Sequence, residues 1–134
     1  MIEARALWTE QDRFAGQASS GHEIVVDAGR EKAANSPMEL VLIALCSCTA
    51  SDVVSILRKK REPFTRVEVL ASGERTEEFP RVFTSIRLIY RISGNVTRKP
   101  VDDAVRLSKE KYCSVSAMLE KSVRIDAVIE LQPQ

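Results

Sequence analysis

The feature that most constrains this chain is a long apolar helix, predicted over residues 36–60. It opens on Ser36-Pro37-Met38-Glu39, with serine at the N-cap, proline at the first helical position and glutamate at the third, the pattern of a capping box. Residues 40–50 are apolar or small on nearly every side, which predicts that this half of the helix is surrounded by protein. Basic residues at 58–61 complement the C-terminal dipole, and Pro63 ends the helix. The fold must therefore be built around this helix.

Segments on both sides of the helix alternate between apolar and polar side chains, which is the period of β-strands. The expected strands cover residues 2–8, 13–18, 22–27, 66–76, 82–92 and 123–131. A shorter helix is expected to open at residues 100–103, and residues 112–116 interrupt its pattern. We therefore predict one α+β domain over residues 1–134. It has an N-terminal β-meander, a long central buried helix, and an antiparallel sheet with helices packed on one face.

The composition is globular, with almost balanced charge. The 134 residues include 20 basic and 19 acidic side chains, so there is no electrostatic reason to expect nucleic acid or an anionic membrane as a partner. The basic run at 58–61 could indicate nucleic-acid binding, but it is short and the chain as a whole is not basic. The apolar stretch at 40–46 is too short to span a bilayer, and Asp52 lies on its continuation. No membrane span is expected.

Cysteine content and the N-terminal residues indicate the compartment. Three cysteines are an odd number, and their spacing is unlike a secreted disulfide framework. Residues 1–5 do not have the basic and then apolar pattern of a signal peptide. We therefore expect a cytoplasmic protein, in which cysteines are reduced by default and a disulfide is usually transient and chemical.

Cys46 and Cys48 are two residues apart on the predicted helix, so their side chains point about 200° apart. They are not expected to face one site, to bond to each other, or to share a metal ion. Cys113 and His22 would complete a zinc-like ligand set, but the sequence has no Cys-x-x-Cys spacing to support it. We predict neither a metal site nor a cofactor.

The neighbours of each cysteine indicate different roles. Cys46 follows an alanine and a leucine, and free cysteine commonly packs as a small hydrophobe. Cys48 has Ser47 and Thr49 beside it and Asp52 one turn on, and polar groups on an apolar helix need partners, so this segment is expected to line a cleft or an interface. Cys113 follows two lysines and breaks a helix, which predicts an exposed, electropositive setting that favours thiolate.

Two motifs resemble those of a known family. Ser36-Pro37-Met38-Glu39-Leu40, followed by Ala44-Leu45-Cys46-Ser47-Cys48-Thr49, resembles the central-helix signature of the OsmC/Ohr superfamily of osmotically inducible and organic hydroperoxide resistance proteins. Tyr112-Cys113-Ser114-Val115-Ser116 resembles its second cysteine motif, which usually reads Cys-Pro-x-Ser. The order of elements also matches, so the resemblance covers essentially the whole chain. It implies an intertwined homodimer with active sites at the subunit interface.

The resemblance also implies a chemistry. The reactive cysteine of the family falls on Cys48 and its resolving cysteine on Cys113. Peroxidase members attack a hydroperoxide with a thiolate, form a sulfenic acid, close an internal disulfide and are reduced by a dithiol. Each step agrees with thiol chemistry, because the thiolate is the nucleophile and a nearby thiol intercepts sulfenic acid before further oxidation.

The sequence departs from the family at two catalytic positions. Met38 stands where peroxidase members have a catalytic glutamate; Glu39 is the next residue, points about 100° away, and is also used by the capping box. The place of the activating arginine falls on His22, the only histidine in the chain. Protonated imidazole would stabilise the Cys48 thiolate, although an exposed strand-end residue is the alternative interpretation of His22. Arg13 and Arg30 are other possible cations.

Two functional hypotheses follow. The first is a thiol-dependent hydroperoxide reductase, with Cys48, Cys113, His22 and Glu39 as the candidate catalytic residues. The second is a non-catalytic or weakly catalytic dimer that binds a small apolar or electrophilic ligand beside Cys48, or senses oxidants through a slow disulfide. Met38 in place of a carboxylate favours the second, because an apolar residue suits binding better than proton transfer.

Overall fold

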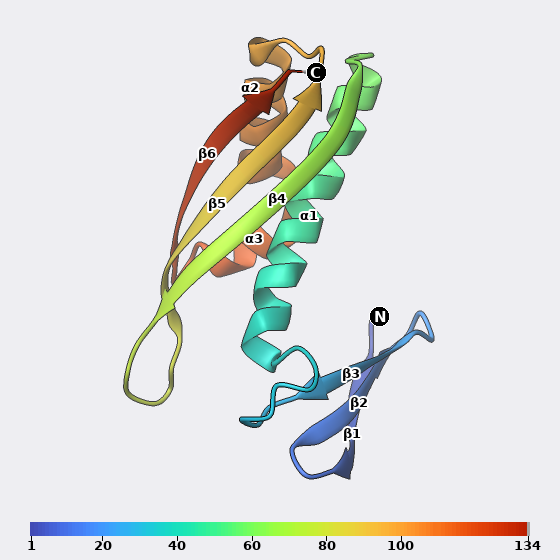
Figure 1. Ribbon diagram of the computed structural model, residues 1–134, viewed down its shortest axis with the longest axis vertical. Helices are drawn as coiled ribbons and strands as arrows, with labels where there is room; N and C mark the ends of the chain where they lie inside the picture. Colours follow the sequence, from blue (N-terminus) through green and yellow to red (C-terminus); the bar gives the residue numbers. More distant parts are fainter. Residues whose placement is uncertain (134) are drawn as a thin grey trace. The chain divides into compact units, whose positions relative to one another are not determined.

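The computed structural model describes residues 1–133, and the chain divides into two compact units (Figure 1). The first unit comprises residues 1–41 and the second begins at Leu42. Each unit contains one three-stranded sheet. The long helix α1, Pro37–Lys59, begins in the first unit and continues into the second.

The first unit is the predicted β-meander. Its strands are β1 (Ala4–Glu10), β2 (Arg13–Ala18) and β3 (Glu23–Asp27), and both pairings are antiparallel in the order β1-β2-β3. Gly21 lies in the second connection with φ of 87°, a conformation that glycine adopts without steric cost. The predicted meander is confirmed.

Asp27 organises the connection between β3 and α1. One carboxylate oxygen accepts a hydrogen bond from the Gly29 amide at 2.8 Å and the other accepts from the Ala33 amide at 3.0 Å. These two backbone donors, more than any other cause, hold the pKa of the Asp27 carboxyl below its usual value. The buried carboxylate thus fixes the loop from which the long helix starts.

The N-terminus of α1 is capped as predicted. The Glu39 amide donates to Ser36 Oγ at 3.2 Å, and the Ser36 amide donates to Glu39 Oε1 at 3.0 Å. Each side chain therefore satisfies a backbone donor that the helix itself leaves unpaired. The capping box is confirmed, and the Glu39 carboxylate is part of it.

Along α1, one narrow stripe is buried within the chain. It consists of residues spaced four apart, Leu45, Thr49, Val53 and Leu57. The predicted enclosure on nearly every side is not found within a single chain, in which Ile43 is 47% exposed. By length and composition alone α1 could cross a membrane, as the core helices of many soluble proteins also could. Its buried stripe nevertheless packs against protein in the second unit.

The second sheet contains β4 (Phe64–Arg75), β5 (Phe83–Gly94) and β6 (Arg124–Gln132), in that order. β4 and β5 form an antiparallel hairpin, but β6 pairs parallel to β5. The expectation of a wholly antiparallel sheet was therefore wrong for this pair. The reason is that the chain between β5 and β6 crosses over through helices, and such a crossover returns the strand in the parallel direction.

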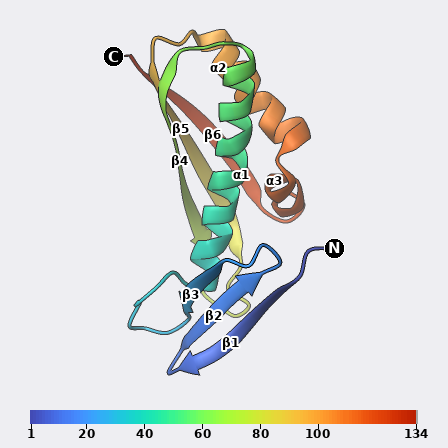
Figure 2. The ribbon, with the colours of Figure 1, turned by 90° about the vertical axis from the view of Figure 1, so that its right-hand side faces the viewer.

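The helices of the second unit lie on one face of this sheet, as predicted (Figure 2). The core between the two layers draws on alternate residues of β5 and on the inner faces of α1 and α2 (Arg98–Leu107). The buried side chains include Ile86, Leu88, Tyr90, Ile92, Val101, Ala104 and Val105. Burial of an aliphatic side chain of this kind contributes about 1.5–3 kcal/mol to folding.

A π-helical turn, η1 (Ser108–Tyr112), follows α2 directly and leads into the short helix α3 (Ser114–Leu119). The Cys113 amide donates to the Ser108 carbonyl, five residues earlier, at 2.8 Å. The interruption predicted at residues 112–116 corresponds to the break at Cys113 between η1 and α3, although residues 114–116 are already helical and the π-helical turn before the break was not predicted. π-helical turns are rare and occur frequently at functional sites.

Candidate active site around two cysteines

Two of the three cysteines, Cys48 and Cys113, meet in the second unit. Cys48 is half-buried on α1, and Cys113 is buried between η1 and α3, with 2% of its surface exposed. All three cysteines are free, and Cys48 is close enough to Cys113 to raise the pKa of the Cys113 thiol. Residues 65 positions apart in the sequence thus place two reduced thiols in the same region of the second unit.

Cys113 is the N-cap of α3. Its sulfur accepts a hydrogen bond from the Ser116 amide at 3.4 Å, and Ser116 Oγ donates to the Cys113 carbonyl at 3.1 Å. Burial raises the pKa of the Cys113 thiol, the hydrogen bonds from Ser116 lower it, and the neighbouring Cys48 thiol raises it again. The net effect is a raised pKa, so Cys113 is held as a thiol.

This setting overturns the expectation that Cys113 is exposed and electropositive. The two lysines that precede it in the sequence are engaged elsewhere. Lys109 Nζ donates to the Ile125 carbonyl at 3.2 Å, and Lys111 Nζ lies 5.2 Å from the centre of the Tyr112 ring. The sequence pattern could not reveal this, because the π-helical turn changes the direction in which the residues after Ser108 point.

Cys46 borders a groove of the second unit. It lines a groove of about 390 Å³ together with residues of α1 and with Val69 and Ala71 of β4. It is half-buried, and burial raises the pKa of its thiol. The predicted divergence of Cys46 and Cys48 on the helix is in keeping with this arrangement, which suits the packing role expected of Cys46.

A chain of hydrogen-bonded side chains includes Thr49, the residue that follows Cys48 on α1. Thr49 Oγ1 is 2.6 Å from Tyr90 Oη and 2.9 Å from Ser108 Oγ, and Ser108 Oγ donates to Asp52 Oδ2 at 2.8 Å. Thr49, Tyr90 and Ser108 are at most 2% exposed, and burial raises the pKa of the Tyr90 phenol. Thr49 and Asp52 stand out in the sequence as polar residues in need of partners. Their partners lie 41 or more residues away and were not predicted.

The two other candidate residues, His22 and Glu39, belong to the first unit. His22 is exposed and lies directly before β3. Glu39 accepts from the Ser36 amide, which is the main reason that the pKa of its carboxyl is below the usual value. Of the four candidate catalytic residues, only Cys48 and Cys113 therefore belong to the second unit.

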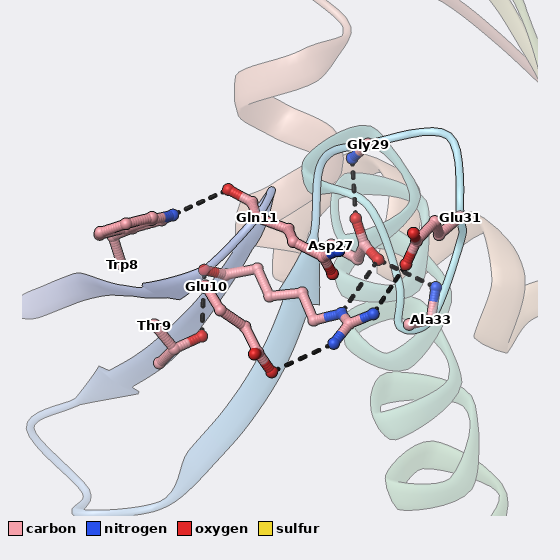
Figure 3. Close-up of polar contacts among 9 residues, drawn as sticks. Trp8, Thr9, Glu10, Gln11, Asp27, Gly29, Glu31 and Ala33 are labelled. Atoms are coloured by element: carbon pink, nitrogen blue, oxygen red, sulfur yellow. Dashed lines mark hydrogen bonds and ion pairs between the residues drawn. The ribbon is translucent and has the colours of Figure 1, made fainter.

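Arg13, another possible cation, is engaged by three carboxylates of the first unit, Glu10, Asp27 and Glu31, which Figure 3 labels. Its guanidinium donates to Glu31 at 2.7 Å and to Glu10 at 3.2 Å, and its Nε lies 3.7 Å from Asp27. These contacts connect β2 to the loop that precedes α1. They assign Arg13 to the support of this loop.

The described residues, 1–133, contain no group of three or more His, Cys, Asp or Glu side chains placed to hold a metal ion. The protein is a small α+β protein with two neighbouring thiols. Its long helix comes between the two three-stranded sheets in the sequence. The chain belongs to the OsmC-like protein family, whose sequence model matches residues 29–128. The resemblance noted from the two cysteine motifs is thereby confirmed.

Individual relatives agree with this assignment. The chain is 47% identical over 125 residues to Protein YhfA of Escherichia coli (strain K12), covering 92% of this chain and 93% of that protein. A hypothetical protein from Aquifex aeolicus VF5 has a TM-score of 0.91 at 32% identity, covering 100% of this chain and 98% of the other. An organic hydroperoxide resistance protein OsmC from Legionella pneumophila has a TM-score of 0.73 at 14% identity, covering 97% and 96%, a likeness of fold alone.

Proposed function

We propose that this protein is a thiol-dependent reductase of organic hydroperoxides, with Cys48 as the nucleophile and Cys113 as the resolving cysteine. The observation that carries the proposal is the proximity of two reduced thiols, one half-buried and one buried, in the second unit, where Cys48 raises the pKa of the Cys113 thiol. The family includes organic hydroperoxide resistance proteins, one of which shares this fold. A pair of adjacent thiols is what a cycle between dithiol and disulfide requires.

The reaction would proceed in three steps. The Cys48 thiolate takes the terminal oxygen of the hydroperoxide; an S–O bond forms, the O–O bond breaks, and the alkoxide leaves as an alcohol with the proton of the thiol. The Cys113 thiol then displaces hydroxide from the Cys48 sulfenic acid, which forms the disulfide and releases water. A dithiol reductant finally supplies two electrons and two protons, regenerates both cysteines, and becomes a disulfide itself.

We also propose that two copies of the chain form a homodimer with the active sites at the interface, in the cytoplasm, where dithiol reductants keep cysteines reduced. Apolar side chains on both units support this, because Trp8 is 62%, Val25 57% and Ile43 47% exposed in the single chain. His22 would act as the cation that favours the Cys48 thiolate, in the role that the resemblance gives it.

The experiment is consumption of cumene hydroperoxide with dihydrolipoate as reductant, for the wild type and for matched cysteine variants. We expect Cys48→Ser to abolish turnover and Cys46→Ser, on the same helix, to retain it. Cys113→Ser should allow one oxidation of Cys48 and then fail to turn over, with Cys48 sulfenic or sulfinic acid detected by mass spectrometry. Turnover by Cys48→Ser at the wild-type rate would end the proposal.

A second candidate function is slow redox sensing, or binding of a small electrophile beside Cys48. The raised pKa of the Cys113 thiol favours it, because a thiol that resists deprotonation is a slow resolving nucleophile. The two functions differ in how much oxidant they consume. A binder reacts once per chain with an electrophile, and a sensor whose disulfide forms slowly consumes little oxidant even in excess dithiol, whereas a reductase consumes many equivalents rapidly.

A further inference from the structure

The hydrogen bonds that link Tyr90, Thr49, Ser108 and Asp52 all run in one direction, toward Asp52. A carboxylate can only accept hydrogen bonds, so the Ser108 hydroxyl donates its one hydrogen to Asp52 at 2.8 Å. Ser108 Oγ must then accept from Thr49, whose oxygen in turn accepts from Tyr90 Oη. Every hydroxyl in the chain is oriented by the carboxylate at its end. Asp52 therefore orients the buried hydroxyl groups of Ser108, Thr49 and Tyr90, although it bonds directly only to Ser108.

Ser108 connects this chain to Cys113. Its hydroxyl bonds to Asp52 and Thr49 on α1, while its carbonyl accepts the Cys113 amide at 2.8 Å. Ser108 is the first residue of η1, and the Cys113 contact closes that turn. The position of the Cys113 backbone is thus set by a residue whose side chain is bonded to the helix that carries Cys48.

Thr49 connects the same chain to Cys48, which precedes it on α1. Thr49 is 2% exposed and bonded to both Tyr90 of β5 and Ser108 of η1, so α1 cannot rotate about its axis without breaking both bonds. Asp52 lies three residues further on, about one turn along the same face. Both thiols are therefore held by one set of hydrogen bonds that ends at Asp52.

We infer that Asp52 is a positioning residue for the Cys48–Cys113 thiol pair, and that it acts through the side chain and the carbonyl of Ser108. The effect of Asp52 on turnover rests on the proposed function. Its effect on how closely the two thiols are held does not depend on that function. Without the Asp52 acceptor, the Ser108 hydroxyl and the π-helical turn lose their orientation. The encounter of the two sulfurs becomes less frequent.

The experiment measures how strongly the pair is held together. In glutathione buffers the protein dithiol and oxidised glutathione form the protein disulfide and two reduced glutathione molecules, and the midpoint gives the effective concentration of the two thiols. The variants are made with Cys46→Ser, so that only one pair can form. Asp52→Ala should lower the effective concentration about tenfold, as expected for loss of one hydrogen bond to a charged group.

Asp52→Asn separates positioning from a merely structural effect. Its amide oxygen can still accept from Ser108, so we expect an effective concentration within about threefold of the wild type. Ser108→Ala should reproduce Asp52→Ala, and the double variant should be no worse than Ser108→Ala alone, because Asp52 acts through Ser108. Asp102→Ala, which removes an exposed carboxylate from α2, is the control and should change nothing. If Asp52→Ala does not fold, Ser108→Ala takes its place in the comparison with Asp52→Asn.

A folded Asp52→Ala variant with the effective concentration of the wild type would overturn the inference, as would additive effects in the double variant. The outcome is independent of peroxide turnover. A wild type that forms the disulfide in glutathione buffer but does not consume peroxide would refute the proposed function and leave the inference standing. Peroxide turnover by the wild type, together with an unchanged effective concentration in Asp52→Ala, would refute the inference and leave the proposed function standing.

Discussion

Burial raises the pKa of the Cys113 thiol, and this links the stability of the fold to pH. The folded chain holds this proton more tightly than the unfolded chain, in which the thiol titrates near its ordinary value of 9.0. The stabilisation is therefore complete below about pH 9 and is lost as the pH rises through the raised folded-state value. We expect the wild type to lose stability relative to Cys113→Ser between pH 7.5 and pH 10, a range that spans about 9.

The measurement is urea unfolding of both proteins at the two pH values, in the presence of a reductant. Ser114→Ala, which changes the next residue and removes no titratable group, is the control, and its difference from the wild type should not vary with pH. A difference between the wild type and Cys113→Ser that also stays constant would show that the thiol titrates alike in both states.

At the scale of elements, the capping box bears on the role of Glu39. Glutamine can replace glutamate in this motif, because its side-chain oxygen also accepts from the N-cap amide. We expect Glu39→Gln to change the free energy of unfolding by less than about 0.5 kcal/mol and to retain peroxide turnover. Ser36→Ala should cost about 1 kcal/mol by removing the cap itself. Loss of turnover by Glu39→Gln with unchanged stability would instead assign the carboxylate a catalytic role.

Elements governed by local rules could be predicted from the sequence. The start of α1 was predicted because Ser36 and Glu39 bond to each other's backbone within one turn. The meander of the first unit was predicted because its strands are joined by short turns and pair with their neighbours in sequence. The parallel pairing of β6 was not predicted, since alternation identifies a strand but does not give its direction.

The residues of the candidate site that local motifs identify could be predicted from the sequence, whereas their surroundings could not. The motifs identified Cys48 and Cys113, and the structure brings them together. The burial of Cys113 and the partners of Thr49 depend on how α2 and η1 lie against α1 and β5. Those contacts join residues 41 and 59 positions apart, which no local pattern specifies.

For the whole molecule, the apolar surface of α1 predicts association. If a second copy covers this surface, then a charge introduced there would be buried without a partner, at a cost of several kcal/mol. We expect Ile43→Glu to convert a dimer into a monomer in sedimentation-velocity experiments and to abolish peroxide turnover along with it. Phe79→Glu is the control, because this side chain is 88% exposed in the connection between β4 and β5. Ile43→Glu sedimenting as the wild type does would exclude this face of α1 from the interface.

The π-helical turn before Cys113 has a consequence for insertions and deletions. A π-helical turn holds one residue more than an α-helical turn between the same two bonded groups. Deleting one residue from 108–112 would let the turn close with α-helical geometry, and the Cys113 amide could still bond to the Ser108 carbonyl. The side chains between these two residues would then point in new directions, and the hydrogen bond from Lys109 to the Ile125 carbonyl would be lost. The extra residue of this turn therefore determines which side chains between Ser108 and Cys113 face the sheet.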